Sequence, residues 1–166
     1  AYGLQNKPEL ALAAIARNSL LCSALSNGWL GQVWALYRAD VLWLAGQKAQ
    51  SRKEAARAVG DRYPPASRGV TGSYCRWLAI LGTTGLGNRF APRIAAEAFS
   101  GRQALDVLDQ LEVSIAVRAI CARSDGDRAE AAGQVIRELE GRLPDATFDF
   151  LSRFAIMPEV LPTART

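Results

Sequence analysis

The side chains best suited to chemistry in this chain are three cysteines. Cys22, Cys75 and Cys121 each lie in an apolar stretch, where a free cysteine behaves as a small hydrophobic residue. Their odd number and wide spacing indicate reduced thiols rather than a disulfide framework. The chain has no histidine, so it lacks the commonest general base and the commonest metal ligand. We therefore expect structural thiols and no metal site.

Two pairs of acidic residues have a spacing that could support general acid–base catalysis. Asp106 and Asp109 stand at the start of an expected helix, and Asp125 and Asp127 stand in an expected turn. Helix caps and solvated charges are the ordinary use of aspartate at such places. We therefore predict that the protein is not an enzyme.

Gly82, Gly85 and Gly87 suggest a phosphate-binding loop at first sight. No strand precedes them, however, and no Gly-Lys-Ser or Gly-Lys-Thr follows, as such a loop requires. We interpret the segment as a linker that breaks a helix, and we expect no cofactor.

Basic residues gather between positions 48 and 62, namely Lys48, Arg52, Lys53, Arg57 and Arg62. The cluster has no interleaved aromatic residue and no helix-turn-helix pattern. We therefore expect a solvated outer face and no direct contact with nucleic acid. Residues 1–93 carry a net charge of +8 and residues 94–166 carry −4, a difference that would also allow copies to associate end to end.

Composition predicts one all-helical domain. The chain has 166 residues, of which 49% are apolar and 29 are alanine, the strongest helix former. No apolar run is long enough to span a membrane, and the chain begins without a signal-peptide pattern, so we expect a cytoplasmic protein. No segment alternates with period two, as strands do.

The helices themselves are bounded by prolines, glycines and capping residues. Gly46 is expected to be a left-handed cap, and Ser51 with Glu54 has the spacing of a capping box. The expected helices cover residues 8–26, 30–45, 51–60, 73–81, 92–99, 104–123, 128–143 and 147–156.

Small residues recur at a spacing of 40 residues, which indicates a repeat. The aligned sets are Ala39, Ala79 and Ala119; Ser51, Ala91 and Ala131; Ala55, Ala95 and Val135; and Ala58, Ala98 and Glu138. Such residues would let antiparallel helices approach closely. The repeat units would be about 8–29 (partial), 30–65, 70–103, 104–144 and 147–157 (partial).

The order of small and bulky residues resembles the tetratricopeptide repeat. The residues that carry the resemblance are Ala39, Leu42, Gly46, Ser51, Ala55, Ala58 and Pro64 and, more loosely, Ala119, Ala122, Gly126, Ala131, Val135 and Pro144. Four departures stand out: Ala55 and Ala95 are smaller than the family's bulky residue, Glu138 replaces an alanine, the proline comes one residue late, and the period exceeds the usual length of about 34. The resemblance implies antiparallel helix hairpins stacked as a short right-handed superhelical array.

Longer, degenerate repeats of this kind resemble the sensor regions of maltose-regulator-type (LuxR-class) bacterial transcription activators. The first and last helices lack a partner in the repeat frame, so we expect a segment of a longer chain. The resemblance implies a module that binds a protein or a small-molecule effector in a concave groove. A free-standing adaptor or secretion chaperone of tetratricopeptide type is the alternative.

The inner face of that groove is implied by the resemblance at the positions that follow the small residue of each first helix. These positions hold Asp40, Trp43, Ile80 and Arg123, with Leu44 and Ile120 beside them. Trp43 would stack on a ligand while Asp40 and Arg123 read its charge. The alternative is that Trp43 belongs to the core.

Overall fold

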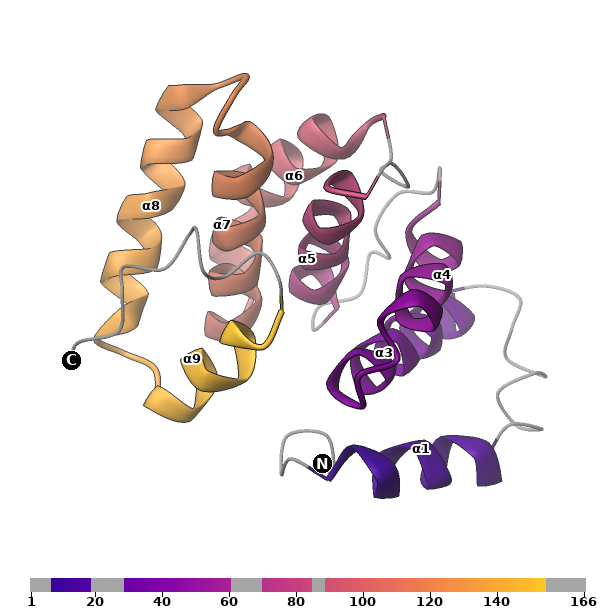
Figure 1. The fold of residues 1–166 in the computed structure, drawn as a ribbon. Helices are drawn as coiled ribbons and strands as arrows, with labels where there is room; N and C mark the ends of the chain where they lie inside the picture. The colour runs from indigo at the N-terminus through magenta and orange to yellow at the C-terminus, as the bar shows by residue number, and fades with distance from the viewer. Residues whose placement is uncertain (1–6, 19–28, 61–69, 85–88, 155–166) are drawn as a thin grey trace. The chain divides into compact units, whose positions relative to one another are not determined.

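The computed structural model describes residues 7–18, 29–60, 70–84 and 89–154, and 81% of these residues are helical, with no strand among them (Figure 1). The helices are α1 (Pro8–Arg17), α3 (Trp29–Leu44), α4 (Lys48–Val59), α5 (Thr71–Gly82), α6 (Ala91–Ser100), the 3₁₀ helix η1 (Arg102–Ala104), α7 (Val107–Cys121), α8 (Gly126–Glu140) and α9 (Asp145–Ser152). The prediction of an all-helical protein is confirmed. None of the helices in the described ranges is both long and apolar enough to cross a membrane.

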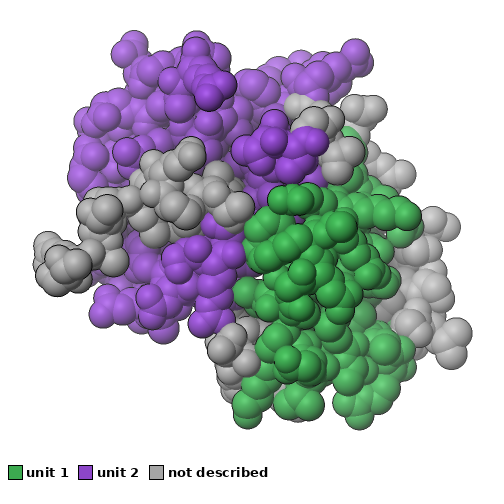
Figure 2. Space-filling model, in the orientation of Figure 1, with its two compact units in different colours: residues 1–65 green, residues 66–166 purple. Residues whose placement is uncertain are grey.

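The chain divides into two compact units, residues 1–65 and 66–166 (Figure 2). The division falls at the end of the expected repeat 30–65. Unit 1 carries eight Lys or Arg against four acidic residues, a net +4, whereas unit 2 carries twelve of each and is neutral. The positive charge of the whole chain therefore belongs to unit 1.

Unit 1 is built on the hairpin of α3 and α4, and Gly46 makes the turn. Its φ of 80° is left-handed, and its N–H donates to the Trp43 carbonyl at 3.0 Å. The N–H of Gln47 donates to the Leu42 carbonyl at 2.9 Å. Together these bonds form a Schellman motif, so the prediction of a left-handed glycine cap is confirmed.

Ser51 has a different role from the expected one. The tight turn lets α4 begin at Lys48, so Ser51 lies inside the helix and the prediction of an N-cap at this position is wrong. Its side chain is fully buried, and Oγ donates to the Ala39 carbonyl at 2.6 Å. The amide of Gln32 likewise donates to the Ala58 carbonyl at 2.8 Å. These two hydrogen bonds join α4 to α3. The small side chains of Ser51, Ala39 and Ala58 let the two helices approach closely there.

Helix α1 covers part of the same hairpin. Ala11 and Ile15 from α1 form a buried apolar cluster with Val41 from α3, and Leu12 and Trp34 pack at its edge. The expected first helix continued to Ser26, but residues 19–28, including Cys22, lie outside the described residues. So do Arg62, Pro64, Gly85 and Gly87.

Unit 2 is organised around α7, which contacts α5, α6 and α8. The core between α7, α8 and α9 is formed by Leu111, Ile115, Ile136, Leu139 and Leu151. Asp106 and Asp125 cap α7 and α8, because their carboxylates accept from the N–H groups of Asp109 and Arg128. For Asp106 the capping interpretation is confirmed, whereas Asp125 caps α8 two residues before the start expected from Asp127. Helix α9 begins and ends a few residues earlier than expected.

The 40-residue spacing predicts that aligned residues of different helices are equally buried. In α4 and α6 the paired positions Ser51 and Ala91, and Ala55 and Ala95, are buried. In α8 the aligned Ala131 and Glu138 are exposed, and the residues that face the core are Ala132, Ile136 and Leu139. The buried face of α8 therefore follows one residue later than the spacing predicts. The stacked superhelical array stays a prediction.

Candidate functional site

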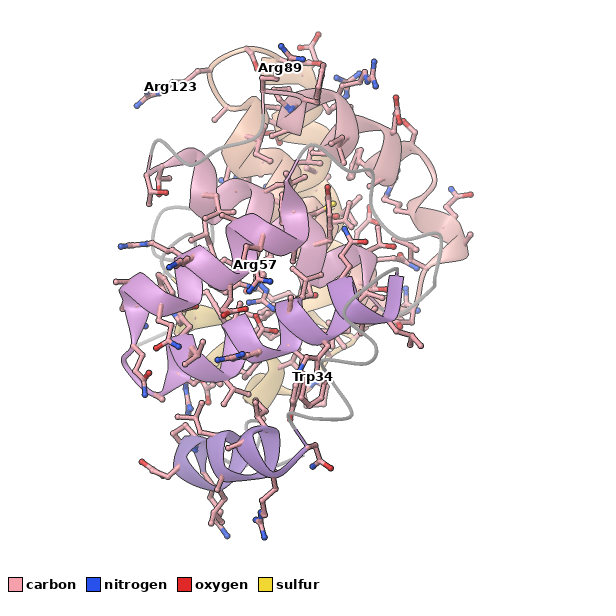
Figure 3. All side chains as sticks on the ribbon, turned by 90° about the vertical axis from the view of Figure 1, so that its right-hand side faces the viewer. Trp34, Arg57, Arg89 and Arg123 are labelled. Carbon is pink, nitrogen blue, oxygen red and sulfur yellow. The ribbon has the colours of Figure 1, made fainter. Side chains whose placement is uncertain are left out.

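The four residues expected to line a groove belong to different units. Asp40 and Trp43 lie on α3 in unit 1, Ile80 lies on α5 in unit 2, and Arg123 follows α7 in unit 2. Trp43 is 3% exposed and Ile80 is 2% exposed, Asp40 is half-buried, and Arg123 is exposed and projects from the ribbon (Figure 3). Two of the four residues therefore lie in each unit, and a groove that all four share stays a prediction.

The indole of Trp43 is covered by cations of the following helix. Lys48 Nζ lies 3.8 Å from the ring centroid and donates to the Trp43 carbonyl at 2.9 Å. The Arg52 guanidinium lies 5.4 Å from the same ring. Burial lowers the pKa of Lys48, and the nearby charge of Arg52 lowers it further. Trp43 is therefore a buried residue whose ring contacts two cations. This agrees with the alternative that Trp43 belongs to the core.

A charged cluster that the sequence pattern did not reveal joins α5 to α7. Arg76 Nε lies 2.9 Å from Glu112 Oε1, and the Asp109 carboxylate accepts from the Gly72 N–H at 3.0 Å. Arg76, Asp109 and Glu112 are 2%, 4% and 5% exposed. Burying a charge costs much free energy unless the charge is paired and hydrogen-bonded. The stability of this cluster therefore depends on the ion pair and the hydrogen bond described above.

Gly72 lets the two helices come together at this cluster. A Cβ at this position would lie 2.5 Å from Glu112 Oε2 and 2.7 Å from Asp109 Oδ1. No side chain fits in that space unless the carboxylates move. Gly72 is thus required by the close approach of α5 to α7.

Aromatic rings complete the surroundings of Arg76. Its guanidinium lies 3.9 Å from the ring centroid of Phe154, which packs edge-on against Trp77 at 6.2 Å. Arg76 Nη2 also donates to Ser73 Oγ at 3.1 Å. Because the cluster is closed to solvent, it fixes helices in place rather than meeting a ligand.

A free and buried thiol, Cys75, lies next to this cluster. Burial raises the pKa of Cys75 to about 12, and the charges of Glu112 and Asp109 raise it in the same direction. A thiol with such a pKa is protonated at neutral pH and is a poor nucleophile. Cys75 and Cys121 are both free and buried, as a structural role requires.

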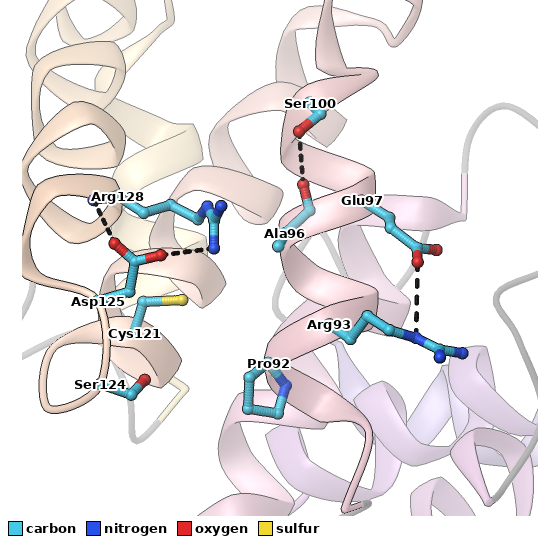
Figure 4. Close-up of a pocket in the computed structure, with 9 residues that line it drawn as sticks. All are labelled: Pro92, Arg93, Ala96, Glu97, Ser100, Cys121, Ser124, Asp125 and Arg128. Carbon is cyan, nitrogen blue, oxygen red and sulfur yellow. Dashed lines mark hydrogen bonds and ion pairs between the residues drawn. The ribbon is translucent and has the colours of Figure 1, made fainter.

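An open groove of about 670 Å³ lies between α6 and the turn that joins α7 to α8. Its lining residues are Pro92, Arg93, Ala96, Glu97, Ser100, Cys121, Ser124, Asp125 and Arg128 (Figure 4). Figure 4 shows the Cys121 thiol and the Arg128 guanidinium on one wall, across from Pro92 and Ala96 on the other.

The charges of the groove are paired within each wall. Arg128 binds Asp125 at 2.6 Å, and Arg93 binds Glu97 at 3.6 Å. The lining thus holds two guanidinium groups and two carboxylates, so its formal charge is zero. Burial raises the pKa of the Cys121 thiol, and the neighbouring Arg128 acts in the opposite direction. The groove therefore presents two internal ion pairs and a buried thiol.

The spacing of residues did not reveal the buried cluster or the groove, for different reasons. The buried cluster had a signal, since Arg76 is the one charged residue of α5 and Asp109 and Glu112 lie three apart in an apolar stretch. The groove had none, because α6 and the turn before α8 meet only in the folded chain. No group of three or more Cys, Asp or Glu side chains suited to a metal ion occurs in the described ranges.

Comparison of the chain with protein-family models, with curated proteins and with solved structures gives no match.

Proposed function

We propose that the chain is a binding module made of helix hairpins. The observation that carries the proposal is the position of α7, which contacts its own partner α8 and both helices of the preceding hairpin, α5 and α6. Stacked repeat proteins depend on such contacts, since each hairpin covers the apolar face of its neighbour. Small residues at shared positions of α4 and α6 also support a repeated plan.

The groove of unit 2 is the proposed effector site. Its walls come from two successive hairpins, and binding sites between packed helices are a common arrangement. Pro92 and Ala96 supply apolar surface, while the Asp125–Arg128 pair supplies both an acceptor and donors. With a formal charge of zero, the lining favours a small uncharged or zwitterionic molecule over a multiply charged one.

A regulatory role follows from the resemblance to the sensor regions of maltose-regulator-type activators. In this proposal the module is the sensor or interaction region of a bacterial transcriptional regulator, and effector binding changes how its hairpins pack. Reading the coding sequence on both sides of residues 1–166 tests this role. A nucleotide-binding loop before the module and a DNA-binding domain after it would support the regulator, whereas neither would favour an adaptor or chaperone.

Thermal unfolding tests the effector site directly. The chain is heated with a panel of amino acids, nucleosides and short oligosaccharides, because a ligand at 100 times its Kd stabilises the folded state by about 2.7 kcal/mol. The variant Ala96→Trp fills the groove, and Ala131→Trp adds the same side chain at an exposed position of α8.

We expect a compound to raise the Tm of the native chain and of Ala131→Trp but not of Ala96→Trp. An equal rise in both variants would place the ligand elsewhere. If no compound raises the Tm of the native chain, the effector site is contradicted for these classes of molecule.

A further inference from the structure

The strongest charge asymmetry of the described residues lies on the α3–α4 hairpin. Residues 29–60 hold five cations against two acidic residues, a net +3. The cations are Arg38, Lys48, Arg52, Lys53 and Arg57, and we refer to them as the basic surface. We propose that the basic surface binds an acidic peptide segment of a partner protein.

Among the described residues of unit 1, acidic partners pair with only part of the basic surface. Glu54 lies 3.8 Å from Arg38 and 3.7 Å from Arg57, so one carboxylate serves two guanidinium groups. Lys48, Arg52 and Lys53 form no ion pair with any described residue. Three positive charges along α4 are thus left for a partner.

Two of these charges are held in place before any partner arrives. Lys48 is fixed by the Trp43 ring and the Trp43 carbonyl, and Arg52 lies over the same ring. Their mutual repulsion contributes to the lowered pKa of Lys48. A carboxylate nearby would relieve that repulsion, and it would meet side chains that lose little freedom on binding.

The outer face of α4 also has an arrangement of small and basic side chains that suits a peptide. At about 100° per residue, Ala49 and Ala56 lie between Arg52 on one side and Lys53 and Arg57 on the other. Lys53 and Arg57 are exposed, and Arg57 keeps 72% of its side-chain surface. Small residues flanked by cations would let a peptide backbone approach while its carboxylates reach both sides.

An acidic peptide fits this surface better than a nucleic acid does. The twelve residues of α4 contain no aromatic side chain on which a base could stack, and Trp43 is buried. The three unpaired cations match a few carboxylates spread over one or two turns of a peptide. This inference concerns unit 1 and does not depend on the groove of unit 2.

Fluorescence anisotropy tests the inference with a labelled peptide of alternating Glu and Ala, and with its Gln and Ala counterpart. The glutamate peptide should bind, and its affinity should fall as salt shortens the Debye length from about 10 Å at 0.1 M to about 3 Å at 1 M. The glutamine peptide should not bind. Lack of binding by the glutamate peptide at low salt would overturn the proposal.

Two charge reversals locate the site. Lys53→Glu lies on the basic surface, whereas Arg142→Glu changes an equally exposed cation in unit 2. We expect Lys53→Glu to weaken the affinity about tenfold and Arg142→Glu to leave it nearly unchanged, because a reversed charge at the site repels the peptide. Circular dichroism checks that both variants stay helical. Equal losses in the two variants would overturn the inference.

Two further controls distinguish a peptide from a nucleic acid as the ligand, and the basic surface from the groove of unit 2 as the binding site. Tighter binding of a single-stranded oligonucleotide than of the glutamate peptide, lost in Lys53→Glu, would replace the peptide by nucleic acid and overturn the proposal. The variant Ala96→Trp, which blocks the groove of unit 2, should leave the peptide affinity unchanged. A loss of peptide binding in Ala96→Trp would move the peptide site to the groove.

Discussion

The two units bring helices together by opposite means. In unit 1, neutral side chains cross between α3 and α4: Ser51 donates to the Ala39 carbonyl and Gln32 to the Ala58 carbonyl. In unit 2, charged side chains cross between α5 and α7: Arg76 pairs with Glu112, and Asp109 accepts from Gly72. Among the described residues, no charged side chain of unit 1 is fully buried, whereas unit 2 buries three.

This difference indicates which substitutions should destabilise each unit. A neutral hydrogen bond contributes about 0.5–1.5 kcal/mol, and its loss costs little more if the remaining partner has other bonds. A buried ion pair contributes little net stability, but the loss of one partner leaves a charge that nothing compensates. Unit 1 should therefore tolerate substitution at its crossing points, and unit 2 should not.

The largest effect is expected from Arg76→Met, which leaves the buried Glu112 without its cation. We expect a loss of about 3–5 kcal/mol in the free energy of unfolding, measured by urea denaturation. The double variant Arg76→Met with Glu112→Leu should recover much of the loss, because it removes both charges. A double variant as unstable as Arg76→Met would show that the charge of Glu112 is not the cause.

The next effect is expected from Gly72→Ala, which puts a methyl group against two carboxylates. The contacts of 2.5 and 2.7 Å force α5 away from α7, at a cost of about 1–3 kcal/mol or more in unfolding free energy. Gly82→Ala is the matched control on α5, since its Cβ would meet nothing within 4 Å. Similar urea midpoints for the two variants would rule out the close approach at Gly72.

A smaller effect concerns the thiol beside the buried charges. The pKa of Cys75 rises from 9.0 to about 12 on folding, so between these values the folded state binds more protons than the unfolded state. Stability should therefore fall as pH rises above 9, by at most about 1.4 kcal/mol per pH unit. Cys75→Ala should show a shallower decline in urea denaturation between pH 8 and about 10. Identical slopes would contradict the prediction.

The smallest effect is expected from Ser51→Ala in unit 1. The variant loses one hydrogen bond to the Ala39 carbonyl, and we expect a cost of about 0.5–1.5 kcal/mol by urea denaturation. Ser114→Ala is a useful comparison, because its hydroxyl bonds the Gln110 carbonyl within α7 itself. If Ser51→Ala cost as much as Arg76→Met, the proposed contrast between the two units would be lost.

Local features of the fold were predictable because their causes are local. Gly46 ends α3 since a left-handed residue is needed there, and Asp106 starts α7 since its carboxylate binds a free N–H group. The start of α8 was expected two residues late, because Asp125 rather than Asp127 is its cap. Ser51 was misread for the same reason: its spacing to Glu54 fits a cap, but the Schellman turn starts α4 earlier and leaves the hydroxyl facing α3.

The expected binding residues show the limit of inference from spacing. Trp43 and Ile80 were placed on an inner face by resemblance, and both are buried in the folded chain. The 40-residue spacing matched two buried positions of α4 and α6 but not Ala58 and Ala98, and it missed the buried positions of α8 by one residue. A slip of one residue turns a helix by about 100°, which is enough to move a core position out of the core.

The sequence by itself determined that this protein is helical, where most of its helices turn, and that its positive charge lies toward the beginning of the chain. The tertiary structure alone decided which charges are buried, which glycine must be bare, and where a groove opens. The reason is physical: capping and helix propensity depend on residues a few positions apart, whereas the Arg76–Glu112 pair joins residues 36 positions apart. Such a pair forms only when helix packing removes water from both partners.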